Sequence, residues 1–352
     1  MAQVDECDAP QSSRFVSDAP KLRVGLDLDG SLESLGNSMT ELADALTGLG
    51  TCDLVRFRSR SRVQHPQEQR LALHWLWSPL WRRSLGRSLD GLVAPVDVLH
   101  VAGLATPPTK KTPLVISVDD LRPLREETRT HQRITQLRRA VSHGAVLVAS
   151  SRTASHEVLQ VLGVSRSQVV VVPPTVPSVA LTDGGRDLVV NITGLIDRFL
   201  TLAPSLIVFA RDSESRVVAV TSAKSAQRIR ASGLAVTVRP RRDAREALAG
   251  ARVVLHISDG ARFPSFAIAA LAAGVPTVAR ATSINRELLD GAALLVTSDE
   301  ELLERLADVW AGEERRSIMI AAGRSRAIDF APATAARSYE ALYRDVVRGW
   351  GP

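Results

Sequence analysis

Two adjacent acidic residues stand where a sheet protein often carries its chemistry. Asp119 and Asp120 directly follow the apolar run 114–118 (LVISV), which predicts a buried strand. Neighbouring residues of a strand point to opposite faces of the sheet, so these two carboxylates do not form an acid/base pair. Asp119 could act alone, as a base or as an acceptor for a substrate hydroxyl. A helix cap or a loop contact is an equally good interpretation.

A second candidate lies between a predicted strand at 22–28 (LRVGLDL) and a predicted helix that begins at about Asn37. Gly36 and Asn37 stand where the backbone N–H groups at the start of a helix can receive an anion such as phosphate. The alternative is a tight turn followed by a helix cap, for which asparagine is well suited. A single glycine does not decide between the two.

The histidines and cysteines show no metal-binding pattern in the sequence. None of the seven histidines has zinc-like spacing, and the two cysteines, Cys7 and Cys52, give neither a disulfide framework nor a ligand pair. His100 and His256 each lie near the end of a predicted strand. We expect both to be structural histidines with satisfied hydrogen bonds, and we expect no bound metal or cofactor.

Aromatic residues and arginines are mixed in the segment 71–88 (LALHWLWSPLWRRSLGRS). The chain carries a net charge of +6, which indicates an anionic partner. One interpretation is peripheral contact with a membrane, through Trp75, Trp77, Trp81, Arg82 and Arg83. Equally, the tryptophans could pack onto the sheet while the arginines face water. No recognised nucleic-acid motif accompanies the charge, so we do not expect nucleic acid as a partner.

The order of apolar runs predicts the elements that must position these residues. Strand-sized runs alternate with helical patterns, which indicates parallel sheets with helices on both faces. The alternation breaks at the prolines of residues 173–177 and then starts again. The sequence therefore predicts an α/β protein of two Rossmann-like domains that face a central cleft near this joint. The predicted strands lie at 22–28, 53–57, 96–101, 114–118, 145–149, 169–172, 188–193, 217–220, 234–238, 253–257, 276–279 and 292–296.

The same pattern predicts where the domains begin and end. We expect a disordered tail over 1–20, a first domain over 21–173, a linker over 174–187, a second domain over 188–330 and a closing helix over 331–352. The tail lacks the basic and apolar regions of a signal peptide. No apolar run approaches the roughly 18 residues of a membrane span. We expect a soluble cytoplasmic protein, at the inner face of the membrane if the tryptophan segment contacts lipid.

Five stretches of the sequence have counterparts, in this order, in one known family. They are LRVGLDLDGSLESLGNSMTELADALTGLG, PLVISVDDLRPLR, AVLVASSRTASHEVLQVLGVSRSQVVVVPPTVP, FPSFAIAALAAGVPTVARATSINRELLDGAALLV and AAGRSRAIDFAPATAARSYEALYRDVV. Their order and spacing resemble the retaining, nucleotide-sugar-dependent glycosyltransferases of family 4 (glycosyl transferases group 1), which have the GT-B fold. The resemblance covers the chain nearly end to end.

The resemblance implies a hexosyltransferase that needs no metal, with a nucleotide-sugar donor on the second domain and a glycan or lipid-linked acceptor on the first. Arg198 and Arg262 would hold the diphosphate, because a planar guanidinium can make two parallel hydrogen bonds to phosphate. A solvated loop arginine is the alternative for both. Glu287 would lie near the nucleotide, or serve as a first-turn glutamate favoured by the helix dipole. The implied donor-side residues are Arg198, Ser258, Arg262, Phe263, Ser283, Ile284 and Glu287, and the acceptor-side residues are Gly36, Asn37, Asp119 and Asp120.

The chain departs from the family where the chemistry should be. Two family glutamates that contact the donor's sugar and ribose are replaced by Ala261 and Ala269. Phe199 stands in place of a phosphate-binding lysine, and Asp119 in place of a histidine. Two hypotheses follow. The chain is a transferase with an altered donor site, or it is an inactive homologue that acts as a binding or scaffold partner, for example of an active glycosyltransferase.

Overall fold

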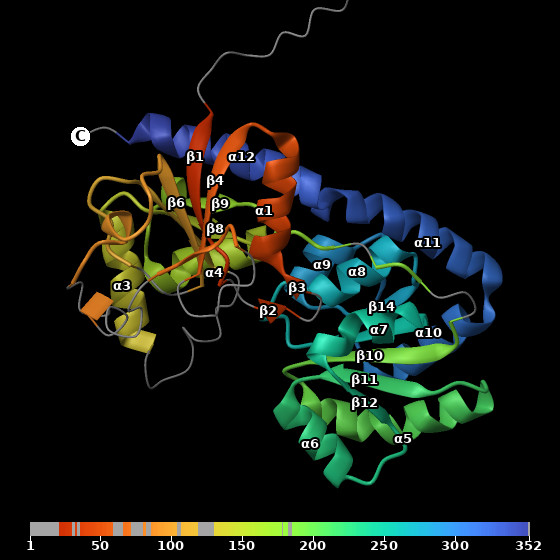
Figure 1. Cartoon of the computed structure of the whole chain (residues 1–352). Coiled ribbons are helices and arrows are strands. Elements are labelled where there is room, and N and C mark those ends of the chain that lie inside the picture. The colour runs from red at the N-terminus through yellow and green to blue at the C-terminus, as the bar shows by residue number, and fades with distance from the viewer. Residues whose placement is uncertain are drawn as a thin grey trace, which may run out of the picture.

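The protein contains two parallel sheets, one in each half of the chain, as the computed structural model shows (Figure 1). The structure describes residues 21–29, 32–33, 36–58, 66–71, 80–81, 86–103, 107–118, 130–177, 179–181 and 185–350. The strands of the first sheet are β1 (Leu22–Asp27), β4 (Cys52–Arg58), β5 (Gln69–Arg70), β6 (Val98–Ala102), β7 (Leu114–Val118), β8 (Val146–Ala149) and β9 (Val169–Val171). Their order across the sheet is β5-β4-β1-β6-β7-β8-β9.

Helices cover both faces of this first sheet. They are α1 (Ser38–Leu49) on one face and α3 (Thr130–Ser142) and α4 (Arg152–Leu162) on the other. Strands β6 and β7 are buried at every position, as expected of parallel strands that are covered on both sides. Helix α4 begins at a serine cap, because the Ser151 side chain accepts the N–H of Ala154, and it ends at Gly163, whose φ of 60° suits glycine.

The second sheet repeats this plan. Its strands are β10 (Asp187–Thr193), β11 (Val217–Thr221), β12 (Thr237–Pro240), β13 (Ala251–Ser258), β14 (Thr277–Arg280) and β15 (Leu294–Val296), in the order β12-β11-β10-β13-β14-β15. The chain starts at β10, moves to one side, and returns to β13 on the other side. Such a reversal leaves a crevice at the carboxyl ends of the two central strands. The helices are α5 (Ile196–Asp212), α6 (Ala223–Ala231), α7 (Ala244–Ala249), α8 (Ser265–Ala273), α9 (Ser283–Leu289), α10 (Asp299–Ala311) and α11 (Glu313–Ala327).

The last helix, α12 (Pro332–Gly349), leaves the second domain and lies along the first (Figure 1). Its buried side chains join the core that α1 forms with the first sheet. Tyr343 and Tyr339 of α12 reach a buried hydrogen-bonded group in that sheet. The Tyr343 hydroxyl lies 2.6 Å from Nδ1 of His100, and the Tyr339 hydroxyl lies 3.1 Å from Oγ of Ser117. The first domain is therefore completed by the end of the chain.

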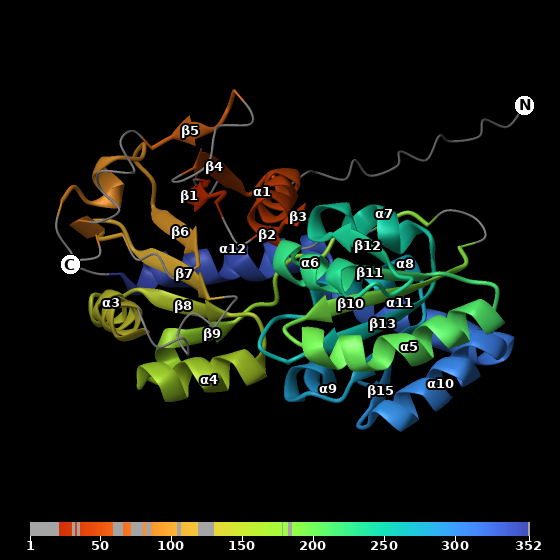
Figure 2. The same ribbon diagram turned by 90° about the horizontal axis from the view of Figure 1, so that it is seen from below.

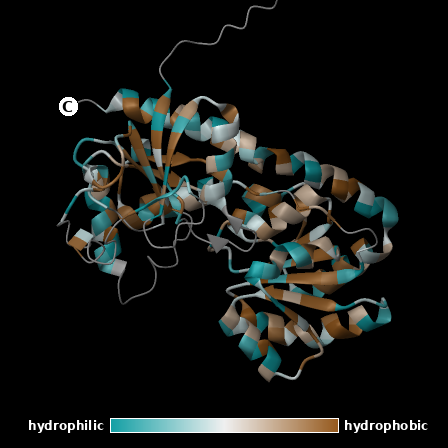
Figure 3. Cartoon of the chain, viewed as in Figure 1, coloured by the Kyte–Doolittle hydropathy of each residue, from teal (hydrophilic) through white to brown (hydrophobic). Residues whose placement is uncertain are grey.

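The distribution of hydropathy follows the layers. Apolar residues are concentrated in the strands of both sheets, while the outer sides of the helices are hydrophilic (Figure 3). Helix α8 is an exception because seven of its residues are buried, including Phe266, Ala269 and Leu271. It lies beneath α11, where Gly323 allows close approach, since a Cβ there would come within 3.1 Å of a Leu271 methyl group.

The predicted fold class is confirmed, and each of the predicted strands is present with small changes in bounds. Three short strands were not predicted: β5 at the sheet edge, and the antiparallel pair β2 (Leu32–Glu33) and β3 (Gly36–Asn37). Each has two residues, which is too short for an apolar pattern to show. Gly36 and Asn37 form the second of these strands, and α1 begins directly after them at Ser38.

Candidate functional site

The joint at residues 173–177 lies between the two sheets and is held on both sides. The Thr175 hydroxyl donates to the carbonyl of Ser38 at the start of α1, over 3.0 Å. The N–H of Val176 donates to the carbonyl of Phe330, over 3.1 Å. A cavity of about 10 Å³ lies beside the joint. That is the room of about one water molecule, and its lining is Ser38, Met39, Leu42, Ser117, Pro174, Thr175 and Tyr339.

The Glu287 carboxylate crosses from the second domain to the first. Its Oε1 accepts the N–H of Arg152 over 2.6 Å, and its Oε2 accepts both the N–H and the hydroxyl of Thr153 over 2.7 Å. These donors belong to the first turn of α4, where unsatisfied N–H groups and the helix dipole favour a carboxylate. Helices α4 and α9 face each other there (Figure 2). The Glu287 carboxylate therefore links the two domains, and its position in the sequence did not indicate this contact. We call it the Glu287 latch.

A second ion pair joins the domains on their other side. Arg245 of α7 lies 3.1 Å from Glu41 of α1. Between these contacts lies a cavity of about 10 Å³ that is lined by Ser150, Thr153, Ala154, Glu157, Gly260, Ala261, Phe263 and Ile284. The lining combines the start of α4 with the loops after β13 and β14.

Arg198 lies in the first turn of α5, at the carboxyl edge of the second sheet. Its guanidinium is bound to Asp299, with Nε at 2.8 Å and Nη2 at 2.6 Å from Oδ1. Arg280, the last residue of β14, lies 3.8 Å from the same carboxylate. Burial, followed by the nearby charge of Arg198, lowers the pKa of Arg280. Two guanidinium groups thus meet at one carboxylate, beside the acidic first turn of α10, which holds Asp299, Glu300 and Glu301.

The other predicted donor-side residues lie at the end of β13, in the loop that follows it, and at the start of α9. Ser258 is buried, and its hydroxyl accepts the N–H of Gly260 over 3.1 Å. Phe263 packs edge-on against Phe330, with ring centroids 5.8 Å apart, and also lines the small cavity. Arg262 is half-buried beside it. Ser283 begins α9 and is exposed, whereas Ile284 is buried and lines the cavity.

The two alanines at the positions where the resemblance predicts glutamates occupy different environments. Ala261 is half-buried and lines the small cavity. Ala269 lies in the middle of α8, has 0% exposure and belongs to the apolar core. The loop could therefore accept a longer side chain at 261, but the helix could accept one at 269 only by disturbing the core.

On the proposed acceptor side, only some of the predicted residues belong to the part of the chain that the structure describes. Gly36 and Asn37 lie in the β2–β3 pair just before α1. Asp119 and Asp120 lie outside the described residues, so their predicted roles stay predictions. Ser117, two positions before Asp119, is buried, and its Oγ lies 2.8 Å from Nε2 of His100.

The two strand-end histidines are buried and differ in their hydrogen bonds. Both ring nitrogens of His100 have partners, as expected of a structural histidine. His256 has Nδ1 at 2.9 Å from Oδ1 of Asn191, but its Nε2 and the Asn191 Nδ2 have no partner in the structure. Burial lowers the pKa of His100 to about 3 and that of His256 to about 4. Both rings are therefore neutral at pH 7.

Trp81 packs inside the first domain. It is 7% exposed, and its Nε1 donates to the carbonyl of Arg87 over 2.8 Å. Of the two interpretations of the tryptophan segment, packing holds for Trp81, so membrane contact through this residue is wrong. Trp75, Trp77, Arg82 and Arg83 lie outside the described residues. Within the described part of the chain, no helix has the length and apolarity needed to span a bilayer.

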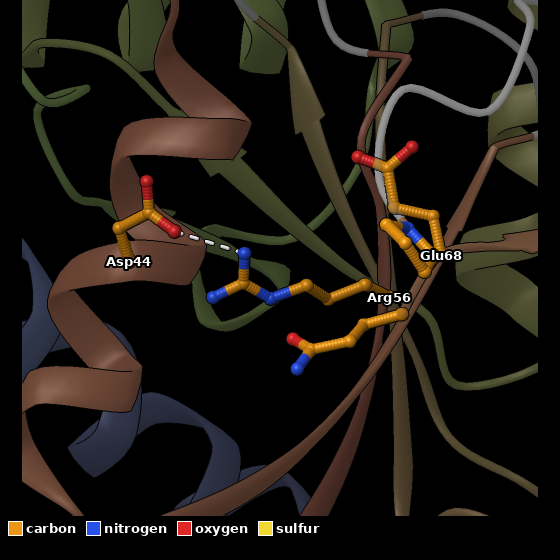
Figure 4. Close-up of a pocket in the computed structure, with 5 residues that line it drawn as sticks. Asp44, Arg56 and Glu68 are labelled. Atoms are coloured by element: carbon orange, nitrogen blue, oxygen red, sulfur yellow. Dashed lines mark hydrogen bonds and ion pairs between the residues drawn. The ribbon is translucent and has the colours of Figure 1, made fainter.

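A larger cavity, of about 460 Å³, lies on the first domain and is lined by Asp44, Arg56, Pro66, Gln67 and Glu68 (Figure 4). Its charged groups are already paired. Arg56 binds Asp44 over 2.9 Å, and Glu68 binds Arg58 over 2.7 Å. All five lining residues belong to the first domain, so this cavity is separate from the cleft. Among the described residues, no group of three or more acidic, histidine or cysteine side chains could hold a metal.

The two sheets, with their carboxyl ends toward a common cleft, match solved structures over nearly the whole chain. A sucrose-phosphate synthase from Thermosynechococcus elongatus matches 94% of this chain and 100% of its own length, at 15% identity and a TM-score of 0.67. The chain has the GT-B fold. WaaG, a glycosyltransferase involved in lipopolysaccharide biosynthesis, matches 93% of this chain and 100% of its own length, at 13% identity and a TM-score of 0.67.

A third match carries ligands. Anabaena HepE in complex with UDP and glucose covers 92% of this chain and 100% of its own length, at 15% identity and a TM-score of 0.61. At such identities, the likeness shows the fold alone. No protein-family model matches the sequence, and no curated protein matches it either.

Proposed function

We propose that the protein is a nucleotide-sugar-dependent glycosyltransferase that moves a hexose to a glycan or lipid-linked acceptor with retention. The observation that carries this proposal is the pair of guanidinium groups, Arg198 and Arg280, that meet at Asp299 at the carboxyl edge of the second sheet. Ligands of open α/β sheets bind beyond that edge. The proposal gains support from HepE, a neighbour of the same fold that holds UDP and glucose.

In this proposal the donor diphosphate would lie near Arg198 and the loops that precede α8 and α9. Guanidinium groups favour the negative charge that develops on a departing diphosphate. The acceptor would approach from the first domain, near Asp119 and the β2–β3 pair. The protein's own contribution is to hold the two substrates in line and to exclude water when the domains close.

In this proposal the domains separate to admit the donor and close over it afterwards. The contacts that would open are those of Glu287 with α4 and the Glu41–Arg245 pair. Such opening and closing is common where chemistry must be protected from water.

The test is to incubate the full chain with UDP-glucose, GDP-mannose and ADP-glucose, and to measure thermal shift and release of nucleoside diphosphate. We expect one donor to raise the melting temperature and to be turned over. Arg198→Ala should weaken that binding, whereas Arg211→Ala should not, because Arg211 lies at the far end of the same helix in an exposed ion pair. No thermal shift with any donor would contradict the proposal.

The second candidate is an inactive homologue that binds a sugar nucleotide, a glycan or an active glycosyltransferase. The observation that favours it is the burial of Ala269, which removes one of the two family carboxylates from reach of any ligand. Binding without release of nucleoside diphosphate, for the wild type and for Ala261→Glu alike, would support this candidate over the enzyme.

A peripheral membrane contact is part of the proposal for a lipid-linked acceptor. It now depends on Trp75 and Trp77 with Arg82 and Arg83, since Trp81 is buried. We expect the chain to sediment with anionic phosphatidylglycerol vesicles, and the Trp75→Ala, Trp77→Ala double variant to stay in the supernatant. Equal sedimentation of the two proteins would exclude this contact.

A further inference from the structure

Asp259 stands at the crevice between the two central strands of the second sheet. It directly follows β13, and its backbone N–H donates to the carbonyl of Thr193, the last residue of β10, over 3.1 Å. Its side-chain Oδ1 accepts the N–H of Ala261 over 3.0 Å. These two bonds tie the ends of the neighbouring strands together and fix the direction of the carboxylate.

The carboxylate lies directly over Gly194. A Cβ added to that glycine would come within 1.9 Å of Oδ2 and 2.5 Å of Cγ of Asp259. The glycine also has a φ of 82°, a conformation that other residues rarely adopt. The close approach of the two loops therefore depends on the absence of a side chain at 194.

The two oxygens of the Asp259 carboxylate differ in their partners. Oδ1 accepts the N–H of Ala261, whereas Oδ2 makes no hydrogen bond and no ion pair within the described part of the chain. Other carboxylates of the same domain are paired with arginine, among them Asp187, Asp197 and Asp299. Asp259 is exposed at the ligand edge of the sheet, so its carboxylate can accept a hydrogen bond from a ligand.

We propose that Asp259 recognises hydroxyl groups of the sugar that the donor carries, at the place where Ala261 no longer offers a carboxylate. This inference rests on the proposed function and adds the residue that selects the sugar. A carboxylate accepts hydrogen bonds from hydroxyls strongly. It repels a diphosphate, because like charges at short distance raise the free energy of the complex. The Asp259 carboxylate should therefore strengthen binding of the sugar and not of the nucleotide.

The experiment compares each nucleoside diphosphate with its sugar derivative by calorimetry, using UDP with UDP-glucose, GDP with GDP-mannose and ADP with ADP-glucose. For the donor that the wild type prefers, we expect Asp259→Asn to weaken sugar-nucleotide binding about tenfold, the effect of losing one charge-assisted hydrogen bond. Binding of the matching diphosphate should stay the same or become tighter. The asparagine keeps a side-chain oxygen for the N–H of Ala261, so the loop should keep its shape.

Two further variants sharpen the result. Gly194→Ala should displace the carboxylate and produce a similar selective loss, and adding it to Asp259→Asn should cost little more. Asp212→Asn is the control, since Asp212 is exposed at the other end of α5 and should leave all affinities unchanged.

Three outcomes would overturn the inference. If Asp259→Asn tightens diphosphate and sugar nucleotide equally, the carboxylate only repels phosphate. If it changes neither, the residue does not touch the ligand. If the wild type binds no sugar nucleotide, the proposed function itself fails, which the wild-type titration alone reveals.

Discussion

The buried histidine of the first domain, His100, connects two strands and the last helix. Its Nδ1 lies 2.6 Å from the Tyr343 hydroxyl and its Nε2 lies 2.8 Å from Oγ of Ser117. Burial lowers the pKa of the ring to about 3, and burial also raises the pKa of Tyr343 well above its ordinary value. The network is therefore neutral at pH 7, and a neutral network is what an apolar core can hold.

This histidine predicts how stability depends on pH. A folded-state pKa near 3 lies below the unfolded value of about 6.5, so the unfolded chain binds the extra proton first as the pH falls. The free energy of unfolding should fall by about 2 kcal/mol between pH 7 and pH 5 through His100 alone. Urea unfolding at the two pH values measures this, and His100→Asn should remove that part of the difference.

The matched control is Tyr343→Phe. It removes the same hydrogen bond but keeps the histidine, so it should lower stability at both pH values by a similar amount. A pH dependence that is the same in His100→Asn as in the wild type would show that this ring does not govern it.

The two alanines give the second prediction at this scale. Ala269→Glu places a carboxylate in an apolar core at a position of 0% exposure. Overpacking together with a buried charge should cost about 3 kcal/mol or more, or roughly 10 °C in melting temperature. Ala261→Glu lies on a half-buried loop and should change the melting temperature by less than about 2 °C. Calorimetry of both variants tests this, and equal effects would contradict it.

The strands that carry the candidate site could be placed from the sequence, because strand ends are readable from apolar runs. Arg198 and Ser258 lie at the carboxyl edge of the second sheet, whereas Glu287 lies within α9 and binds the start of α4. Their partners could not be predicted. Arg198 is paired with a residue 101 positions away, and Glu287 with one 135 positions away. Such contacts depend on how the domains and helices meet, and no local pattern encodes them.

At the scale of elements, helix α9 reaches across the joint to α4. The Glu287 carboxylate satisfies two backbone N–H groups and one hydroxyl there. The spacing of apolar residues in a sequence specifies only which side of a helix faces its own sheet. This spacing does not specify contacts between helices of different domains, such as the Glu287 latch.

Removing the latch should open the molecule. Glu287→Ala leaves the first turn of α4 without its acceptors, so the closed form should lose roughly 1–3 kcal/mol relative to the open one. We expect a larger radius of gyration in small-angle X-ray scattering. The control is Asp290→Ala at the end of the same helix, whose side chain is exposed. An unchanged radius for Glu287→Ala would mean that Glu41–Arg245 and the joint hold the closed form by themselves.

At the scale of the whole molecule, the chain passes between the domains twice, at residues 173–177 and again at Ala331 before α12. The second passage places Ala335, Ala336, Tyr339, Leu342 and Tyr343 in the core of the first domain. The sequence showed the helix but not its destination, because an amphipathic face fits either sheet equally well. The first domain is therefore assembled from the two ends of the chain, with the second domain between them.

Because α12 packs in the core of the first domain, its removal should destabilise the first domain more than the second. A chain that ends at Ala331 exposes the apolar face shared by β1, β6 and α1, whereas the second sheet keeps its own helices. Hydrogen exchange should show lost protection in β1 and β6 and unchanged protection in β10 and β13. Arg348→Ala, an exposed change on the same helix, is the control. Loss of protection in both sheets would mean that the domains unfold as one unit, since α12 would then support the second domain through the joint as well as the first domain directly.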